Sequence, residues 1–357
     1  MRVLVASGSS GGHIFPAISF IEALKAGNND AQVLLVLPKK NILKAEGVLP
    51  CPVKYITVTP IKLNFSFAGL KSIWQMIKSF FQVILIFINF RPDVAIGFGS
   101  LASLPVILLA WFFRTTTVIH EQNVLPGKAN KFLAYFSDKI AVSFKETVGY
   151  FKGKEKKIVL TGDPIRKSLV RIDKKIACAY LALKEDKFTI LVAGGSQGCS
   201  RINEEFVKFI GFIPQKNKLQ VIHLCGSKDY SRLKESYAGL GIEYKLFDFL
   251  QPMEYAYSAA DLIISRAGAT TIAEIMFFAL PAVIIPYPYA YQHQLNNALV
   301  LERAGAALII KDEELSLGQL KRMVLPLIDN QVSLSKMRGA YYGLSIPDAA
   351  ERLAACV

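Results

Sequence analysis

The sequence predicts an α/β protein with two Rossmann-like, doubly wound parallel-sheet domains. Three observations predict this class. The chain has 357 residues, whereas a single hydrophobic core usually stops growing at about 250–300 residues. A unit of apolar strand, glycine turn and helical stretch occurs twice. Short apolar runs alternate with helical stretches in both halves, which is typical of doubly wound sheets.

The duplicated unit opens each half of the chain. The segment VLVASGSSG at 3–11 aligns with ILVAGGSQG at 190–198. A continuous apolar run indicates a strand buried on both faces, as in a parallel sheet. Glycines let a ligand approach the turn closely, and the N-terminus of the following helix offers unpaired N–H groups to a phosphate. We therefore expect each half to begin with a strand that leads into a phosphate-binding turn.

Eight further apolar runs predict the other strands. They are 32–37, 93–97, 117–120 and 139–142 in the first half, and 220–225, 244–247, 261–265 and 282–286 in the second. Ligands bind at the carboxyl edge of open α/β sheets. With two such domains facing each other, we expect the site in a central cleft between them.

The boundary between the domains is expected near Gly162-Asp163-Pro164, because proline restricts the residue before it to extended conformations. This gives a first domain of residues 1–163 and a second of residues 164–340. The remaining segment, 341–357, is expected to form a helix that packs back on the first domain.

Charge and cysteine content restrict the function classes. Of the net charge of +14, residues 1–166 contribute +11, from 20 Lys and Arg against 9 Asp and Glu. Such a field attracts nucleic acid, anionic lipid or phosphorylated ligands. A basic nucleic-acid-binding protein is one alternative, but the sequence has no aromatic RNA platform motif and no basic recognition helix. The five cysteines and four histidines lack metal-site spacing, so we expect neither a disulfide framework nor a bound metal.

Two apolar stretches bear on membrane contact. The first, 73–90, is interrupted by polar residues, and the second, 104–113, is shorter than the roughly 20 residues that a spanning helix needs. We therefore expect no integral span, and we read the N-terminus as a first strand and not a signal peptide. The first stretch has the spacing of an interfacial amphipathic helix, with an ordinary core helix as the alternative. Its apolar positions are Ile73, Trp74, Ile77, Phe80 and Phe81, and the interspersed lysines are Lys62, Lys71 and Lys78.

The first glycine loop, 8–12, is followed by His13. A histidine at a helix N-terminus beside a glycine turn is suited to act as a general base or as a phosphate donor. A nicotinamide enzyme would carry an acidic residue at the end of the second strand, where this sequence has Lys39 and Lys40. A tight turn without any function would leave His13 unexplained.

A second polar motif, His120-Glu121-Gln122-Asn123, follows a predicted strand. Four adjacent polar residues at a strand end are unlike core residues and predict a functional role. The alternative is that Asn123 only caps the following helix.

Three segments of the second half predict a nucleotide-sugar site. Ser196 lies in the second glycine turn, where it and backbone N–H groups are suited to phosphate. Glu274 falls early in the helix after the turn at 265–270, where it would interact with the helix dipole or hold two ribose hydroxyls. The amide-rich segment 292–297 suits sugar hydroxyls, because amides both donate and accept hydrogen bonds.

Taken together, these motifs resemble the MurG family, the undecaprenyl-diphospho-muramoylpentapeptide N-acetylglucosaminyltransferases that make lipid II for peptidoglycan. The likeness covers nearly the whole chain, and its segments occur in the order of the family. These segments are 8–13, 120–123, 162–166, 194–203, 265–274, 294–298 and 345–349.

The resemblance implies a GT-B fold and an inverting, β-1,4-forming transfer. N-acetylglucosamine would pass from UDP-N-acetylglucosamine to the C4 hydroxyl of the muramoyl sugar of the prenyl-diphosphate-linked acceptor, lipid I. It also implies a peripheral protein on the cytoplasmic face of the bacterial plasma membrane, with an anionic membrane surface as partner, and no cofactor or nucleic acid. A different UDP-sugar transferase of the same fold, with another acceptor, is the alternative within this class.

The resemblance also implies roles for individual residues. His13 is the expected base or acceptor-orienting group, with Glu121 as its rival. In the donor site, Glu274 would hold the ribose, Ser196 and Arg166 the diphosphate, and Leu250 the uracil. Ala269 and Thr270 would lie at the diphosphate and sugar, and Asn123 and Gln294 would hold the N-acetylglucosamine. The first loop, with Ser10, Gly11 and Gly12, would serve the donor and also the acceptor diphosphate, together with Gly97, Gly99 and Ser100.

Three departures from the family pattern affect the substrate loops. The first loop reads Gly8-Ser9-Ser10 where Gly-Gly-Thr is usual, so Ser10 is expected to supply the hydroxyl. The second reads Gly99-Ser100-Leu101 where Gly-Gly-Tyr is usual, which removes an aromatic contact to the acceptor. Tyr291-Gln292 stands where paired acids are common. The donor residues are otherwise present.

Overall fold

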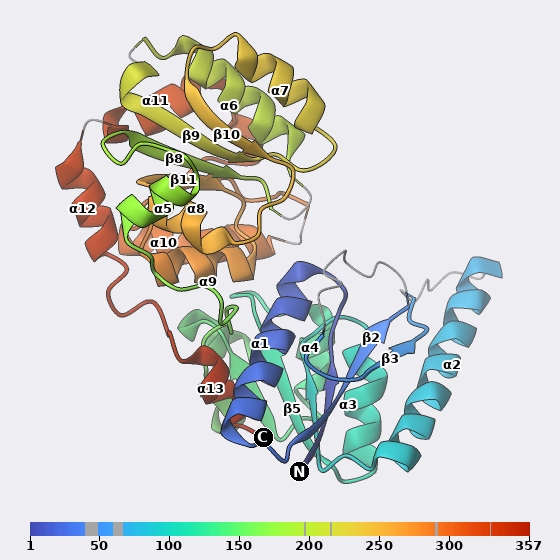
Figure 1. The fold of residues 1–357 in the computed structure, drawn as a ribbon. Coiled ribbons are helices and arrows are strands. Elements are labelled where there is room, and N and C mark those ends of the chain that lie inside the picture. Colours follow the sequence, from blue (N-terminus) through green and yellow to red (C-terminus); the bar gives the residue numbers. More distant parts are fainter. Residues whose placement is uncertain (40–48, 60–66, 196–197, 215, 290–291, 329) are drawn as a thin grey trace. The chain divides into compact units, whose positions relative to one another are not determined.

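The computed structural model describes residues 1–39, 49–59, 67–195, 198–214, 216–289, 292–328 and 330–357. The chain forms two compact units (Figure 1). The N-terminal unit contains Met1–Arg166 and Ile346–Val357, and the C-terminal unit contains Lys167–Ser345. The chain thus leaves the first unit at Arg166 and returns to it at Ile346, whereas the sequence predicted boundaries after residues 163 and 340. Ser196, Lys62 and Tyr291, on which sequence predictions were made, lie outside the described residues.

The N-terminal unit contains a seven-stranded sheet in the order β3-β2-β1-β4-β5-β6-β7. All its strand pairs are parallel. The strands are β1 (Arg2–Ala6), β2 (Gln32–Pro38), β3 (Val53–Ile56), β4 (Val94–Gly97), β5 (Thr116–Glu121), β6 (Lys139–Val142) and β7 (Ile158–Leu160).

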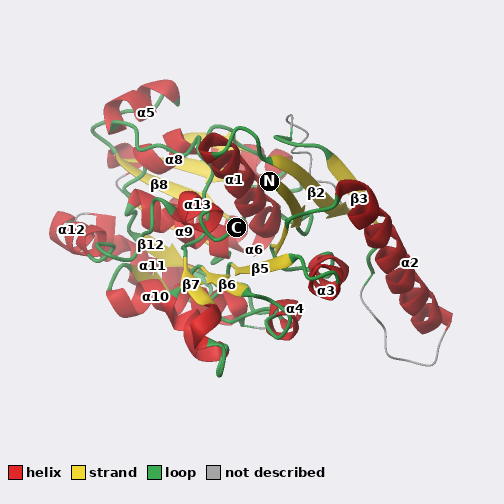
Figure 2. Cartoon of the chain, turned by 90° about the horizontal axis from the view of Figure 1, so that it is seen from below, coloured by secondary structure: helices red, strands yellow, loops and turns green. Residues whose placement is uncertain are grey.

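Helices cover both faces of this sheet. On one face lie α1 (Gly11–Gly27) and α13 (Ala349–Ala354), and on the other lie α2 (Phe67–Phe90), α3 (Ser103–Phe112) and α4 (Lys128–Leu133) (Figure 2). Alternate residues of β1 therefore enter different cores: Val3 and Val5 pack with α1, and Leu4 packs with α2 and α3. Burial on both faces is the physical reason for the continuous apolar run of this strand.

The C-terminal unit contains a six-stranded parallel sheet in the order β10-β9-β8-β11-β12-β13. Its strands are β8 (Phe188–Ala193), β9 (Leu219–Leu224), β10 (Glu243–Phe247), β11 (Leu262–Ser265), β12 (Ala282–Ile284) and β13 (Ala307–Ile309). Its helices are α5 (Lys174–Tyr180), α6 (Ser200–Phe212), α7 (Tyr230–Ala238), α8 (Met253–Ala259), α9 (Ala269–Phe278), α10 (His293–Ala304), α11 (Leu317–Ile328) and α12 (Gln331–Gly339). The prediction of two doubly wound parallel sheets is confirmed.

One core of this unit lies between β8 and α6. Ile190 and Val192 of the strand pack with Phe206 and Phe209 of the helix, and all four side chains are buried. The amphipathic pattern of α6 follows from this one-sided packing. The glycine turn at 194–198 connects the two elements, so packing of the helix fixes where the turn begins and ends.

Candidate functional site

In each unit, the glycine loop lies where the strand order reverses. In the N-terminal unit the reversal lies between β1 and β4, which are followed by residues 7–10 and 98–102. In the C-terminal unit it lies between β8 and β11, which are followed by residues 194–199 and 266–268. Loops that leave such a point run to opposite faces of the sheet and open a crevice at its carboxyl edge. In each unit, this edge of the sheet is therefore the place at which a ligand is expected.

His13 lies between the two loops of the N-terminal unit. Its Nδ1 is 3.3 Å from the hydroxyl of Ser10. A Cβ atom added at Gly99 would lie 3.4 Å from Nε2 of His13, and one added at Gly8 would lie 3.2 Å from Cδ2. The imidazole is therefore in close contact with both glycine loops, and the predicted residues Ser10, His13 and Gly99 lie together.

The glycines of these loops have different physical roles. A Cβ atom at Gly12 would meet no described atom within 4 Å other than those of its chain neighbours and its own helix backbone, so packing does not require glycine there. A Cβ atom at Gly97 would come within 3.0 Å of Ser103, so this glycine allows α3 to pack against β4. Gly99 and Ser100 have φ angles of 73° and 66°, in the left-handed region. Gly12 is therefore suited to ligand contact, and Gly97 is a packing residue.

Glu121 is buried at the end of β5, and its carboxylate accepts four hydrogen bonds. Oε1 accepts from the backbone N–H of Asn123 at 2.9 Å and from its Nδ2 at 3.2 Å. Oε2 accepts from the N–H of Gly127 at 3.0 Å and from Nδ2 of Asn130 at 2.8 Å. This carboxylate fixes the loop that carries Asn123, and its acceptor capacity is occupied by the protein.

His120 and Gln122 are also buried and brace the same strand end. Gln122 Nε2 donates to Nδ1 of His120 at 3.2 Å, which leaves Nε2 of His120 to donate to the carbonyl of Gly162 at 3.1 Å. Burial lowers the pKa of His120 to about 4, so the ring is neutral at neutral pH. Of the four residues of this motif, Asn123 is the one that is only partly buried.

Arg166, the last residue before the chain leaves the N-terminal unit, lies against the first turns of α1. Its guanidinium carbon is 5.1 Å from the centroid of the Phe15 ring. This cation–π contact holds a positive charge beside the helix that begins at Gly11. The arrangement is suited to an anionic group.

In the C-terminal unit, the glycine turn is shaped by close backbone contacts. A Cβ atom at Gly194 would lie 2.5 Å from the backbone nitrogen of Cys199, and one at Gly198 would lie 2.0 Å from the carbonyl oxygen of Cys225. A Cβ atom at Gly195 would have no neighbour within 4 Å. The space in the Cβ direction of Gly195 is thus free of described atoms and could admit a ligand. Ser196, the predicted diphosphate contact, lies outside the described residues.

A buried arginine connects the loops at the strand reversal of the C-terminal unit. Arg266 forms an ion pair with Asp312 at 2.6 Å and donates to the carbonyl of Ile285 at 3.0 Å. It also donates to Sγ of Cys199 at 2.9 Å, which ties the loop after β11 to the glycine turn. Asp312 pairs in addition with Arg201 at 3.1 Å. Sequence analysis did not identify Arg266 as a site residue. The signal that could have identified it is a charged residue placed between an apolar strand and a glycine turn.

The first turns of α9 carry two of the predicted donor residues. Thr270 is 8% exposed, and its hydroxyl has no hydrogen-bond partner among the residues that the structure describes. Glu274, one turn further on, is 6% exposed and accepts a 2.7 Å hydrogen bond from the hydroxyl of Tyr257. A buried hydroxyl without a partner at a helix N-terminus is suited to an anionic oxygen. Ala269 is the first residue of the same helix.

Gln294 and Leu250 border the same edge of the sheet. The amide oxygen of Gln294 accepts from the N–H groups of Ala267 and Tyr287, at 3.1 and 2.9 Å. These two hydrogen bonds fix the orientation of the Gln294 side chain. Its amide nitrogen is then the atom that can donate to a ligand. Leu250 is buried after β10, next to Phe249, whose ring is exposed. Among the described residues, no group of three or more His, Cys, Asp or Glu side chains could hold a metal ion.

Asn130 is the second residue that sequence reasoning missed. Its Nδ2 donates to the carbonyl of His120 at 3.0 Å as well as to Glu121, and its buried Oδ1 has no partner. The same Nδ2 lies 3.5 Å from where a Cβ atom of Gly99 would stand. Asn130 therefore lies between the loop of Asn123, which it helps to hold, and the glycine loop beside His13. A single amide within a short helix gave no signal in the sequence.

Comparison with protein families gives two matches. Residues 3–142 match the N-terminal domain of glycosyltransferase family 28, and residues 189–353 match its C-terminal domain. One relative, from Halothermothrix orenii, is 38% identical, covering 94% of this chain and 93% of its own. Another, from Thermoanaerobacter sp., is 39% identical, covering 99% and 98%. Both are named UDP-N-acetylglucosamine–N-acetylmuramyl-(pentapeptide) pyrophosphoryl-undecaprenol N-acetylglucosamine transferase.

Solved structures share the fold. Acinetobacter baumannii MurG superposes with a TM-score of 0.78 at 24% identity, covering 99% of this chain and 98% of that one. The UDP-N-acetylglucosamine 2-epimerase of Neisseria meningitidis, bound to UDP-N-acetylglucosamine, gives a TM-score of 0.69 at 14% identity, covering 100% and 99%.

Proposed function

The chain belongs to glycosyltransferase family 28, and from this membership we propose its reaction and the roles of its residues. It transfers N-acetylglucosamine from UDP-N-acetylglucosamine to N-acetylmuramyl-(pentapeptide) pyrophosphoryl-undecaprenol, lipid I. The products are lipid II, the precursor of peptidoglycan, and UDP. The observation that carries the assignment of roles is that each unit places its glycine loop and its polar residues at one reversal of strand order.

The reaction exchanges one bond at the anomeric carbon of the donor. The C4 oxygen of the muramoyl sugar forms a bond to this carbon, and the bond to the β-phosphate oxygen of UDP breaks with its electron pair. The transition state resembles an oxocarbenium ion, negative charge grows on the departing diphosphate, and the hydroxyl proton needs an acceptor. The protein must therefore supply a base on the acceptor side and positive groups or N–H donors on the diphosphate side.

His13 is the base that accepts the proton of the C4 hydroxyl. Its position between the two glycine loops, with Ser10 at Nδ1, supports this role. Glu121 is the less suitable candidate, because it is buried and its two oxygens already accept four hydrogen bonds. Glu121 and Asn130 then position Asn123, which holds the transferred sugar.

The C-terminal unit binds the donor. The N-terminus of α9, with Ala269 and the unpaired hydroxyl of Thr270, receives the diphosphate, together with Ser196 and the glycine turn. Glu274 holds the ribose, and Leu250 borders the uracil. Gln294, whose oxygen is fixed by two backbone N–H groups, donates its amide N–H to a sugar hydroxyl. Arg166 contributes positive charge to the departing diphosphate.

The N-terminal unit binds the acceptor and contacts the bilayer that holds it. Gly11, Gly12 and Gly99 border the acceptor diphosphate, and Ser100 adds a hydroxyl. The helix α2 supports the membrane contact, because one side of it packs on the sheet through residues such as Val83 and Phe87. Its opposite side exposes an apolar stripe: Ile73, Trp74, Ile77, Phe81, Leu85 and Ile88.

This membrane contact is interfacial. By length and composition alone, Lys71–Phe90 is the one helix among the described residues that could cross a membrane. Because one of its sides belongs to the core of the unit, insertion across the bilayer would require that side to leave the sheet. A helix that lies in the membrane surface keeps both contacts and places the protein on the leaflet that displays its acceptor.

The test of the chemical role is His13→Ala. A positioned general base contributes about 10²–10⁴-fold to the rate, so turnover of the prenylated acceptor should fall by about that factor. UDP affinity, measured by titration calorimetry, should stay unchanged, because the proposed UDP contacts lie elsewhere. Turnover at the wild-type rate would show that His13 is not the base.

A further inference from the structure

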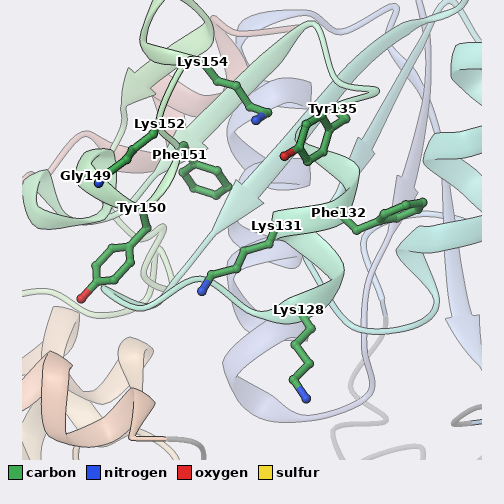
Figure 3. Close-up of a pocket in the computed structure, with 9 residues that line it drawn as sticks. All are labelled: Lys128, Lys131, Phe132, Tyr135, Gly149, Tyr150, Phe151, Lys152 and Lys154. Carbon is green, nitrogen blue, oxygen red and sulfur yellow. The ribbon is translucent and has the colours of Figure 1, made fainter.

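A cavity lined by lysines and tyrosines lies on the N-terminal unit, beside α4 (Figure 3). Its volume is about 610 Å³, within the range of ligand pockets, about 300–1,000 Å³. Two lysines come from α4, Lys128 and Lys131, and two from the segment after Tyr150, Lys152 and Lys154. None of the residues proposed above to bind the donor or the acceptor lines this cavity, which we call the lysine pocket.

The lining of the pocket concentrates positive charge, and Glu155, just outside the lining, interacts electrostatically with Lys154. Its lining contains no acidic side chain. Lys131, Lys152 and Lys154 form no ion pair with any carboxylate in the described part of the chain. Like charges gathered in a concave site repel one another and raise the local concentration of anions. An anionic group is therefore the ligand that this pocket favours.

Tyrosine rings hold two of the ammonium groups. Lys154 Nζ lies 3.7 Å from the centroid of the Tyr135 ring, and Lys131 Nζ lies 5.7 Å from that of Tyr150. Both pairs are visible in Figure 3, where each amine points toward its ring. Such cation–π contacts orient the lysines at a modest gain in free energy and leave their N–H donors available. Tyrosine is also common at the level of lipid headgroups, since one end of its side chain is apolar and the other polar.

The pocket is continuous with the exposed apolar side of the unit. Phe132 lines it, and its ring packs against Phe136, whose other neighbour is Trp111 at the end of α3. The adjacent Phe113 packs against Phe87 of α2. Trp111, Phe112, Phe113 and Phe132 all have exposed rings. An aromatic surface therefore leads from the end of α3, which is anchored on α2 through Phe87, to the rim of the lysine pocket.

From these observations we propose that the lysine pocket binds the phosphate headgroup of one anionic phospholipid, whose acyl chains lie along the adjoining aromatic surface. This inference rests on the proposed membrane contact. Lysine ammonium groups bind phosphate as compact point charges. The adjoining apolar surface favours a lipid over a free phosphate or a water-soluble polyanion, since it would otherwise stay in water. Bound lipid would hold the unit in one orientation on the leaflet, which diffuse charge cannot do.

The test compares two triple variants of the full chain with equal net charge. The pocket variant is Lys131→Gln, Lys152→Gln and Lys154→Gln. The control variant is Lys175→Gln, Lys234→Gln and Lys336→Gln, at exposed lysines of the C-terminal unit. Flotation uses vesicles of phosphatidylcholine alone and vesicles that also contain phosphatidylglycerol. Thermal unfolding of both variants checks that they are folded.

The pocket variant should bind the anionic vesicles at least about tenfold more weakly than the control, since each lysine near an anionic surface contributes about 1 kcal/mol. Both variants should bind the neutral vesicles alike. Equal losses in the two variants would mean that only the diffuse field acts, and would overturn the proposal. An anionic preference of the pocket variant as large as that of the control variant would also overturn it.

Further measurements distinguish this proposal from the membrane contact of α2, from binding of free phosphate and from binding of the acceptor peptide. Phe81→Ser with Leu85→Ser should weaken binding to both kinds of vesicle; if it does not, the proposed membrane contact is wrong, independently of the pocket. A short-chain phosphatidylglycerol, added below its micelle concentration, should stabilise wild type saturably and should not stabilise the pocket variant, whereas inorganic phosphate should have a much weaker effect. A raised acceptor KM of the pocket variant in detergent, without vesicles, would instead assign the pocket to the acceptor peptide and overturn the lipid assignment.

Discussion

The carboxylate of Glu121 accepts a 2.8 Å hydrogen bond from Nδ2 of Asn130, nine residues further along the chain. Both side chains are buried, and the same carboxylate also holds the backbone of Asn123 and Gly127. Asn130 in turn reaches the vicinity of Gly99. One acidic residue therefore sets the loop that we propose holds the transferred sugar, and it does so close to the glycine loop beside the base.

Replacing Glu121 by Gln should destabilise the protein and reduce activity. The amide nitrogen of Gln would face N–H donors, so at least one hydrogen bond of the four would be lost and a buried donor left unpaired. We expect the free energy of unfolding to fall by about 1–3 kcal/mol. We expect kcat to fall with it, because Asn123 would lose its fixed position. Urea unfolding and steady-state kinetics measure the two effects, and Glu146→Gln, at an exposed site, is the matched control.

Alanine at Gly12 and at Gly97 should have opposite effects. Gly12 lies in α1 and a Cβ atom there would meet no protein atom, so Gly12→Ala should raise stability by up to about 1 kcal/mol, the usual gain in a helix. It should nevertheless raise the KM of the acceptor, because the methyl group would occupy the space of the diphosphate. Gly97→Ala should lower the melting temperature through its 3.0 Å contact with Ser103. An unchanged acceptor KM for Gly12→Ala would contradict the proposed diphosphate position.

Removing the partner of the buried arginine should cost more than removing the pair. Asp312→Leu leaves the guanidinium of Arg266 without its counter-charge, and we expect a loss of about 3 kcal/mol of stability. The double variant Arg266→Met, Asp312→Leu should recover most of that loss. Both variants should bind UDP-N-acetylglucosamine more weakly. In the double variant the hydrogen bond from Arg266 to Cys199 is absent, and in Asp312→Leu the arginine is no longer held in position to make it. Additive losses in the double-mutant cycle would show that the two residues are not coupled.

His223, in the core of the C-terminal unit, should make stability depend on pH. Its Nδ1 faces the hydroxyl of Tyr237 at 2.9 Å and its Nε2 faces Oδ1 of Asn203 at 3.0 Å. Burial lowers its pKa to about 3, below the ordinary value near 6.5. The unfolded chain therefore binds a proton that the folded protein does not, so this contribution to stability is complete above about pH 6.5 and is lost as pH falls toward about 3.

The loss attributable to His223 between about pH 7 and about pH 5 should be about 2 kcal/mol. Urea unfolding at the two pH values measures it, and His223→Gln should show a smaller difference than wild type by that amount. His120 has a similar environment in the N-terminal unit and contributes to both curves equally. If the two pH dependences were identical, the ring of His223 would not be held neutral by burial.

The central strands were predictable from the sequence, and of the four edge strands only β10 was. Every apolar run assigned to a strand corresponds to an observed strand, with ends that differ by a few residues. The strands without a prediction are β3, β7 and β13, and each is the last strand at an edge of its sheet. An edge strand is buried less completely, so its sequence need not be a continuous apolar run. In β3, for example, Lys54 and Tyr55 are exposed.

The candidate site was predictable where residues form compact motifs. His13, Glu121, Thr270 and Glu274 lie in such motifs, and the fold places each at the carboxyl edge of its sheet. Asn130 and Arg266 became apparent only from their contacts, because their partners lie in other loops. The distinction between Gly12 and Gly97 also required the structure, since two glycines in glycine loops look alike until the atoms around each Cβ direction are known.

The return of the chain at Ile346 has a consequence for synthesis of the protein. Leu353 and Cys356 belong to the same core as Val3 and Phe20, and α13 packs on α1. A ribosome makes the whole C-terminal unit before it makes these residues. The N-terminal unit, although it is translated first, therefore has an incomplete core until the C-terminal unit has been synthesised. We expect the N-terminal unit to be the last to complete its folding in the cell.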